Sequence, residues 1–147
     1  MDIMRMESGF LHWGHDISPE ENQYEAGLNF AISYKKNINF VGKEALLKIK
    51  DQNPTKSLAM MVLKDNRPGE PLLLHEEPIY LDDKIIGRTT SGNYSFNFKK
   101  NISFGYVNSG NTIENLVNKN LSIEVEKKKY PVTIIKKPLN QKNIKDI

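Results

Sequence analysis

The stretch Pro78–Thr90 reads PIYLDDKIIGRTT, with two apolar runs on either side of the pair Asp82-Asp83. Short runs rich in β-branched and aromatic residues favour strands, and polar residues between them favour a turn. We therefore predict a β-hairpin with strands over Pro78–Leu81 and Lys84–Thr90.

Similar short apolar runs lie on both sides of this hairpin, and polar segments separate them. Several short strands at such spacing are typical of a small β-barrel or sandwich, and we predict an all-β small barrel here. The basic run Lys127-Lys128-Lys129 would form the tip of the last hairpin. The further predicted strands are Ser57–Leu63, Ile102–Val107, Leu121–Val125 and Tyr130–Lys136.

The part of the chain before these strands has a different pattern. Ser18 and Glu21 are spaced as a capping box, which predicts a short helix that ends at Gly27. The alternating segment Leu28–Ile32 predicts a half-buried strand, and Gly42–Lys50 predicts a second helix with one apolar face.

We expect a domain boundary near Pro54, because proline disfavours a helical conformation at Asn53. Residues 1–53 would then be an α+β remnant, the tail of a larger fold. Residues 54–147 would be the β-barrel domain.

Composition limits the class of protein. The chain contains no cysteine, which excludes disulfides and thiolate metal sites and fits a reducing, cytoplasmic interior. It has no apolar run of about eighteen residues, and its first ten residues are charged, so we expect neither a membrane span nor a signal peptide. The net charge of +3 comes from lysines spread along the chain, which does not favour binding of nucleic acid.

The rarer side chains gather near the amino end. The first sixteen residues hold the only tryptophan, two of the three histidines and one of the three arginines. Arg5 could bind a planar anion through paired hydrogen bonds, or it could be a surface cation paired with Glu7. Spacing alone favours the surface cation.

His12 and His15 lie three residues apart, on either side of Trp13. A metal site would lack a third ligand at a suitable spacing, and a base oriented by Asp16 would lack a serine or cysteine nucleophile. We favour a buried turn, in which Gly14 adopts an unusual backbone angle and the imidazoles bond to the main chain.

Thr90–Tyr94 is a polar stretch at the end of a predicted strand, where Gly92 would let the backbone approach a ligand. A β-bulge or tight turn also explains this stretch, and we favour that interpretation. The acidic pairs at 76–77 and 82–83 indicate solvated turns rather than a buried acid–base pair.

One set of spaced motifs runs through the chain. Its members are Arg5-Met6-Glu7-Ser8-Gly9, Glu25-Ala26-Gly27-Leu28, Phe40–Leu46 and Thr90–Ser95. In this order and spacing they resemble the glycine-cleavage T-protein (aminomethyltransferase) family, over about Arg5 to Pro138. The segment Gly9–Ile17 is similar to the folate lobes that follow the flavin domains of sarcosine and dimethylglycine dehydrogenases.

The resemblance implies both a fold and a reaction. Residues up to about Asn53 would end the family's central α+β lobes, and its C-terminal β-barrel would follow. The reaction would move a one-carbon unit from an amine of the glycine, sarcosine or dimethylglycine type to tetrahydrofolate, giving 5,10-methylenetetrahydrofolate. FAD would belong only to a fused or partner flavin domain.

The resemblance also implies which residues would meet the cofactor. Arg5 matches the motif arginine that borders the folate cavity, and Glu7, His12 and Trp13 would support the same wall. Lys142 or Lys145, with Lys145 the position we select, would supply charge where T-proteins often carry a C-terminal arginine. The family's catalytic aspartate lies upstream and has no counterpart here, so we expect no catalytic residue in this chain.

We therefore expect part of an aminomethyltransferase that depends on N-terminal folate-binding lobes or a flavoprotein partner. The alternative is a noncatalytic β-barrel module that docks such a partner. Relatives that demethylate sulfonium compounds or modify tRNA rank lower. Without its lobes, the segment before Pro54 should expose apolar surface at Phe10, Leu11, Trp13 and Phe30, and cause self-association or local disorder.

Overall fold

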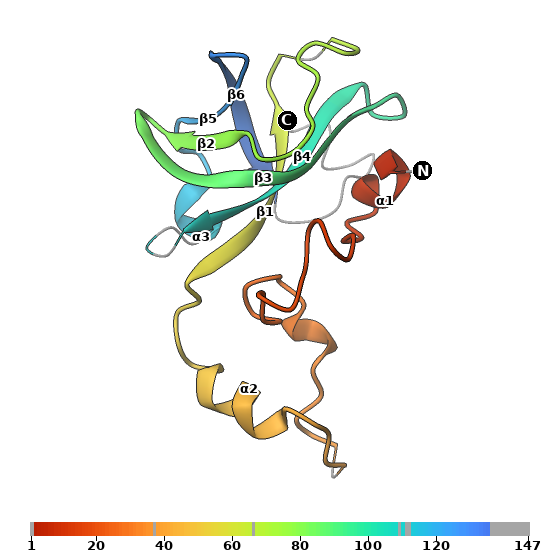
Figure 1. The fold of residues 1–147 in the computed structure, drawn as a ribbon, viewed down its shortest axis with the longest axis vertical. Helices are drawn as coiled ribbons and strands as arrows, with labels where there is room; N and C mark the ends of the chain where they lie inside the picture. The colour runs from red at the N-terminus through yellow and green to blue at the C-terminus, as the bar shows by residue number, and fades with distance from the viewer. Residues whose placement is uncertain (1, 37, 66, 109, 111–112, 136–147) are drawn as a thin grey trace.

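The chain is built around a closed barrel of six antiparallel strands in the order β1-β4-β3-β2-β5-β6 (Figure 1). The computed structural model describes residues 2–36, 38–65, 67–108, 110 and 113–135. The strands are β1 (Lys56–Leu63), β2 (Pro78–Leu81), β3 (Lys84–Ser95), β4 (Lys100–Asn108), β5 (Leu121–Val125) and β6 (Lys128–Ile135). The predicted small β-barrel is thus confirmed.

Strand β1 contributes to two apolar clusters, because successive side chains of a strand point to opposite faces. Ala59, Met61 and Leu63 belong to the cluster that fills the barrel. Val62 belongs to a second cluster, in which Met6 from the first helix is almost fully buried. Helix α1 therefore covers the outer wall of the barrel beside β3 and β4 (Figure 1). The helical elements are α1 (Asp2–Glu7), the 3-10 turn η1 (Asn29–Ala31), α2 (Lys43–Ile49) and α3 (Ile113–Leu116).

Strand β3 is longer than predicted. It continues through the expected polar loop to Ser95, and its register with β4 shifts between Thr89 and Ser91. The β-bulge that we favoured for this stretch is therefore confirmed. The hairpin turn at 82–83 is where the sequence places it. The tip of the last hairpin lies at 126–127, so Lys127 belongs to it as predicted, whereas Lys128 and Lys129 are already part of β6.

The predicted helix over 18–27 is wrong, because the chain makes consecutive turns there. The Ser18 and Glu21 side chains do bond as a capping box would. However, the Asn22 side chain then accepts from the amides of Tyr24 and Glu25, which starts a new turn in place of a continuing helix. Gly27 takes the predicted left-handed conformation, with φ of +70°.

The predicted strand over Leu28–Ile32 is also wrong, since η1 occupies its centre. The barrel is closed and offers this segment no free strand edge with which to pair. Helix α2 confirms the helix predicted over Gly42–Lys50, but each of its residues stays at least partly exposed. Helices α1 and α3 are too short to show a periodic pattern and were not predicted.

Much of the apolar surface predicted for the first part of the chain is exposed. The side chains of Phe10, Trp13 and Phe30 all lie largely in solvent. Leu11 is the exception, because it packs against the outer-wall cluster and is half-buried.

The close approach of Gly92 in β3 to buried Leu73 should make Gly92→Ala destabilising. A Cβ atom on Gly92 would lie 2.4 Å from Leu73 Cβ and 2.9 Å from the Leu73 carbonyl carbon. We expect the free energy of unfolding to fall by about 1–3 kcal/mol, the range for overpacking. Urea denaturation measures this free energy of unfolding. The control is Asn93→Ala, since Asn93 is the exposed neighbour of Gly92. Equal midpoints for the two variants would contradict this packing argument.

Candidate functional site

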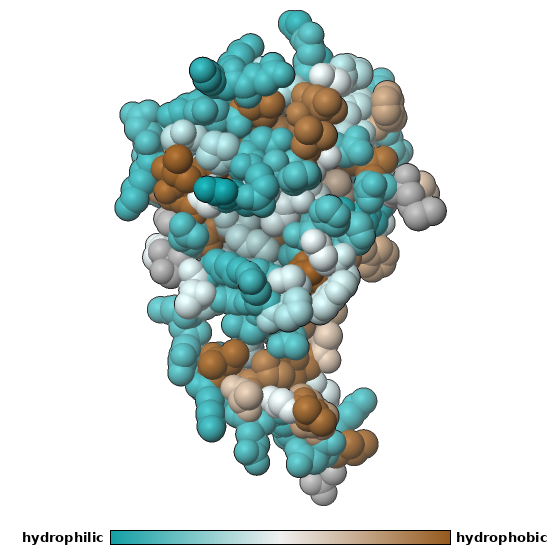
Figure 2. Space-filling model, in the orientation of Figure 1, coloured by the Kyte–Doolittle hydropathy of each residue, from teal (hydrophilic) through white to brown (hydrophobic). Residues whose placement is uncertain are grey.

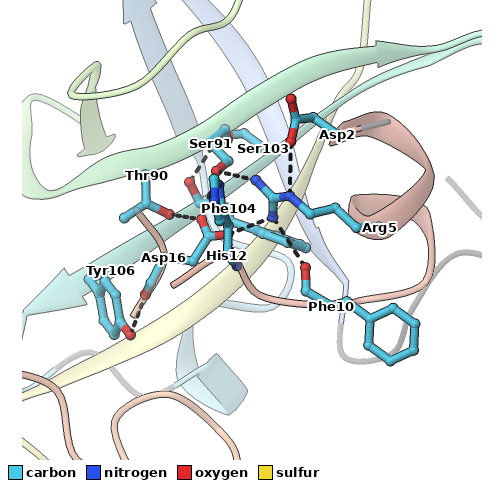
Figure 3. Close-up of polar contacts among 10 residues, drawn as sticks. All are labelled: Asp2, Arg5, Phe10, His12, Asp16, Thr90, Ser91, Ser103, Phe104 and Tyr106. Atoms are coloured by element: carbon cyan, nitrogen blue, oxygen red, sulfur yellow. Dashed lines mark hydrogen bonds and ion pairs between the residues drawn. The ribbon is translucent and has the colours of Figure 1, made fainter. Parts of the chain in front are cut away.

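A fully buried carboxylate, that of Asp16, joins the first part of the chain to the barrel (Figure 3). Its Oδ2 accepts from Arg5 Nη1 at 2.6 Å and from the His12 amide at 2.9 Å. Its Oδ1 accepts from Thr90 Oγ1 at 2.6 Å and from Ser91 Oγ at 2.8 Å. We call Asp16, Arg5, Thr90 and Ser91 the clasp.

The bulge in β3 explains how two successive residues reach one carboxylate. Side chains of neighbouring residues in a regular strand point to opposite faces, so Thr90 and Ser91 would normally diverge. A bulge inserts an extra residue and redirects side chains locally. Ser103 Oγ of β4 donates to the Ser91 carbonyl at 2.9 Å, which ties the bulge to the neighbouring strand.

Arg5 uses most of its hydrogen-bonding capacity inside the protein. A guanidinium carries five N–H donors. Nε donates to Asp2, Nη1 to Asp16 and to the Phe10 carbonyl, and Nη2 to Ser91. Among the described residues, this leaves one N–H of Nη2 without an acceptor. The side chain is only 18% exposed and its ion pairs are with aspartates, so neither a surface cation nor a partner of Glu7 describes it.

The turn at residues 12–17 presents Asp16 to this cluster. The His12 carbonyl accepts from the amides of His15, Asp16 and Ile17, and Gly14 takes the predicted positive φ of +88°. The prediction of a buried turn is wrong for the imidazoles, which are exposed and stack on one another at 4.7 Å between centroids. Only the carboxylate between the turn and β3 is buried. No group of metal-binding side chains forms within the described residues.

The other expected cofactor-binding residues are dispersed. Glu7, two residues after Arg5 on α1, accepts a hydrogen bond from Ser95 at the end of β3. Trp13 lies at the surface and its backbone pairs with Ile17. Lys145 falls outside the described residues. The role of these positions in binding folate stays a prediction.

A groove of about 840 Å³ opens between the first part of the chain and the outer wall of the barrel. Phe10, Leu11 and Leu28 line it from one side, and Met60 and Phe104 from the strands. Arg5 does not line the groove, but it bonds to the carbonyl of Phe10 at the rim. The clasp therefore fixes one edge of a largely apolar groove.

A second network holds the turns at 18–27 against β1 and β4. Lys56 at the start of β1 pairs with Glu21, and the Tyr106 hydroxyl donates to the Asp16 carbonyl at 2.9 Å. Burial, together with the nearby carboxylates of Glu21, Asp16 and Glu25, raises the pKa of Tyr106. Tyr106 thus remains a hydrogen-bond donor over the ordinary pH range.

Comparison with known proteins agrees with this architecture. Residues 56–140 match the model of the glycine cleavage T-protein C-terminal barrel domain. The chain belongs to this family. It corresponds to the C-terminal part of aminomethyltransferase-family proteins.

Individual relatives give the same result. The chain is 34% identical to dimethylglycine dehydrogenase of Rattus norvegicus over 95% of its own length and 16% of the relative's. It is 34% identical to an aminomethyltransferase of Listeria welshimeri, over 93% of its length and 36% of the relative's. The aminomethyltransferase T of Bartonella henselae shares the fold, with a TM-score of 0.78, 21% identity and coverage of 93% of this chain and 37% of that one. The chain thus spans about a third or less of the curated relatives that it matches.

Sequence reasoning identified Arg5 but assigned its key partners poorly. Asp16 was considered only as an orienting group for His15, and Ser91 only as part of a polar loop. The two residues are 75 positions apart, so no periodic pattern links them. The only signal that connects them is the family resemblance, which Thr90–Ser95 carries as part of the motif set and Gly9–Ile17 as a likeness to one subgroup. No helix among the described residues is long and apolar enough to cross a membrane.

Removal of the Asp16 carboxylate should be strongly destabilising, because Arg5 and the two hydroxyls would lose a buried acceptor. We expect Asp16→Ala to lower the free energy of unfolding by about 3 kcal/mol or more. The matched control is Asp83→Ala. Asp83 is fully exposed and pairs with Lys129, so its removal should change the free energy of unfolding little. Guanidinium denaturation of both variants measures the difference. Similar losses would show that Asp16 is not a structural centre.

Glu21 should make stability depend on pH. Burial alone would raise the pKa of Glu21, but the hydrogen bonds from Lys56 and Ser18 outweigh it and hold the pKa below its ordinary value of 4.5. A lowered folded-state pKa stabilises the fold above the unfolded pKa, and this contribution is lost as pH falls through the folded value. Glu21→Gln should therefore be less stable than the parent near neutral pH.

The difference between the parent and Glu21→Gln should shrink as the solution is acidified below the ordinary glutamate pKa. Denaturation midpoints at a series of pH values measure this. The control is Glu20→Gln, since Glu20 is exposed and lies next to the network. A deficit that stays constant into acid would indicate lost packing instead of a lost charge.

Proposed function

We propose that the chain supplies the C-terminal part of a tetrahydrofolate-dependent aminomethyltransferase. The enzyme would transfer a one-carbon unit from an amine of the glycine, sarcosine or dimethylglycine type to the folate. The observation that carries the proposal is the family match, joined to the position of the family's Arg5 motif at the rim of an apolar groove. The expected location of the enzyme is the cytoplasm.

The described residues fit one wall of such a site. Ligand pockets are typically apolar clefts of about 300–1,000 Å³ with a few fixed polar groups, and the groove has this character. Arg5 keeps one N–H of Nη2 for an anionic ligand, while Asp16 and Ser91 fix the direction of the guanidinium. When bound, tetrahydrofolate supplies the amine nitrogens that accept the one-carbon unit. The residues of this chain orient and enclose the folate, and the catalytic carboxylate is expected in the upstream lobes.

Binding of tetrahydrofolate to a chimera tests the proposal. In the chimera, this chain replaces the matching 36% of the Listeria welshimeri aminomethyltransferase. We expect calorimetry to show binding to the chimera and little or none to the chain alone. Arg5→Gln should raise the Kd of the chimera for tetrahydrofolate tenfold or more, because a hydrogen bond that involves a charged group contributes about 1.5–3 kcal/mol.

The matched control is Arg88→Gln, because Arg88 is an exposed arginine on β3 that pairs with Glu76. Circular dichroism of each variant establishes that the fold is kept. A folded chimera that binds no folate would refute the proposal and would favour the noncatalytic docking module. If both arginine substitutions changed folate binding equally, Arg5 would not belong to the folate site.

A further inference from the structure

Arg5 is surrounded by more negative than positive charge. Its Nε donates to Asp2 at 3.3 Å and its Nη1 to Asp16 at 2.6 Å, so two carboxylates face one guanidinium (Figure 3). A third carboxylate, that of Glu7, lies two residues further along α1. Residues 2–17 contain these three acidic side chains and one basic side chain, hence a net charge of −2 with neutral histidines.

The ion pair of Arg5 with Asp16 is largely removed from water. Asp16 is fully buried and the side chain of Arg5 is only 18% exposed, so salt screens this pair little. The charge of Arg5 is therefore balanced within the protein, and the more exposed Asp2 adds a further negative charge. A carboxylate of a ligand would gain little attraction from Arg5 and would be repelled by Asp2. The free N–H of Nη2 suits a neutral oxygen or nitrogen instead.

The apolar groove whose rim Arg5 holds has no positive charge either. Among the described residues that line it, Glu114 is the only ionisable one, and it is acidic. Phe10 and Phe104 also line the groove. Figure 2 shows hydrophobic residues gathered at the end of the molecule that carries η1, whose Phe30 is a further lining residue. A carboxylate in this groove would lose hydration without gaining a cation, whereas an uncharged ring system would gain apolar contact.

We infer that Arg5 and the groove recognise the uncharged, ring-bearing part of folate and not its carboxylates. The free N–H of Arg5 Nη2 donates to a neutral acceptor, such as an amide oxygen or a ring nitrogen. The inference deepens the proposed function and rests on it, since the ligand is the one proposed there.

The first experiment compares tetrahydrofolate with its dimethyl ester, in which both carboxylates are uncharged. Calorimetry gives the Kd of each compound for the chimera and for its Arg5→Gln variant, and this cycle isolates any contact between Arg5 and the carboxylates. We expect Arg5→Gln to raise both Kd values by the same factor, about tenfold. A rise for tetrahydrofolate with no change for the ester would overturn the inference.

Asp2→Asn changes the charge beside Arg5 and keeps an amide oxygen that can accept from Nε. We expect the Kd for tetrahydrofolate to stay within about twofold of the parent chimera, because a neutral acceptor gains little from an added positive charge. The matched control is Asp83→Asn, which makes the same charge change on an exposed aspartate at the β2–β3 turn. Binding of tetrahydrofolate that Asp2→Asn tightens severalfold more than Asp83→Asn would identify Arg5 as a carboxylate site.

The intact chain without folate separates this inference from the proposed function. Acetate is added while nitrogen NMR follows the Nε–H signals of Arg5, Arg67 and Arg88. Arg67 and Arg88 are matched controls, because each pairs with one glutamate and is largely exposed. We expect acetate to shift the Arg5 signal no more than theirs, and a larger shift at Arg5 would contradict the inference. If the chimera bound no folate and acetate left Arg5 unchanged, only the proposed function would be refuted.

Discussion

The buried carboxylate of Asp16 is the constraint on which the arrangement of the chain depends. An ionised carboxylate away from water is stable only when its oxygens are fully hydrogen-bonded, and here a guanidinium, two hydroxyls and an amide supply the bonds. These donors come from α1, from the turn at 12–17 and from the bulge in β3. Residues 2–17 are therefore fixed to the barrel through this carboxylate, and Met6 adds apolar burial on the same wall. The clasp thereby holds these residues as the rim of a groove.

The strength of attachment decreases along the first part of the chain. The clasp holds residues 2–17, and the Glu21–Lys56 pair with the buried Glu25 holds the turns that follow. Beyond Gly27, residues 28–50 line an apolar groove, but none of the side chains described in this segment is buried. The local stability of the chain should therefore fall from the clasp towards this segment, because local stability follows the density of buried contacts.

The features that follow from local rules were predictable from the sequence. The apolar run of β1 and the acidic turn before Lys84 favour strands without reference to distant residues, and the spacing of such runs favours a barrel. The wrong predictions concern segments whose structure is decided by groups outside the local sequence pattern. Asn22 redirects a helix start that Ser18 and Glu21 had signalled, and the closed barrel denies the segment after Gly27 a strand to pair with. The clasp needs a bulge and a turn 75 residues apart, which periodicity does not encode.

The bonding of Arg5 limits how this surface can recognise an anion. In most arginine sites the planar fork grips a carboxylate of the ligand with two parallel bonds. Here the carboxylate of Asp16 and the hydroxyl of Ser91 occupy the inner donors, and Asp2 occupies the Nε donor on the exposed side. A ligand would meet one N–H of fixed direction and a charge already partly balanced. Lysine, which lacks the planar fork, could not hold these acceptors and keep one N–H directed outward, so it could not replace Arg5 within the clasp. Under the proposed function, most of the affinity for the ligand would therefore come from the apolar groove.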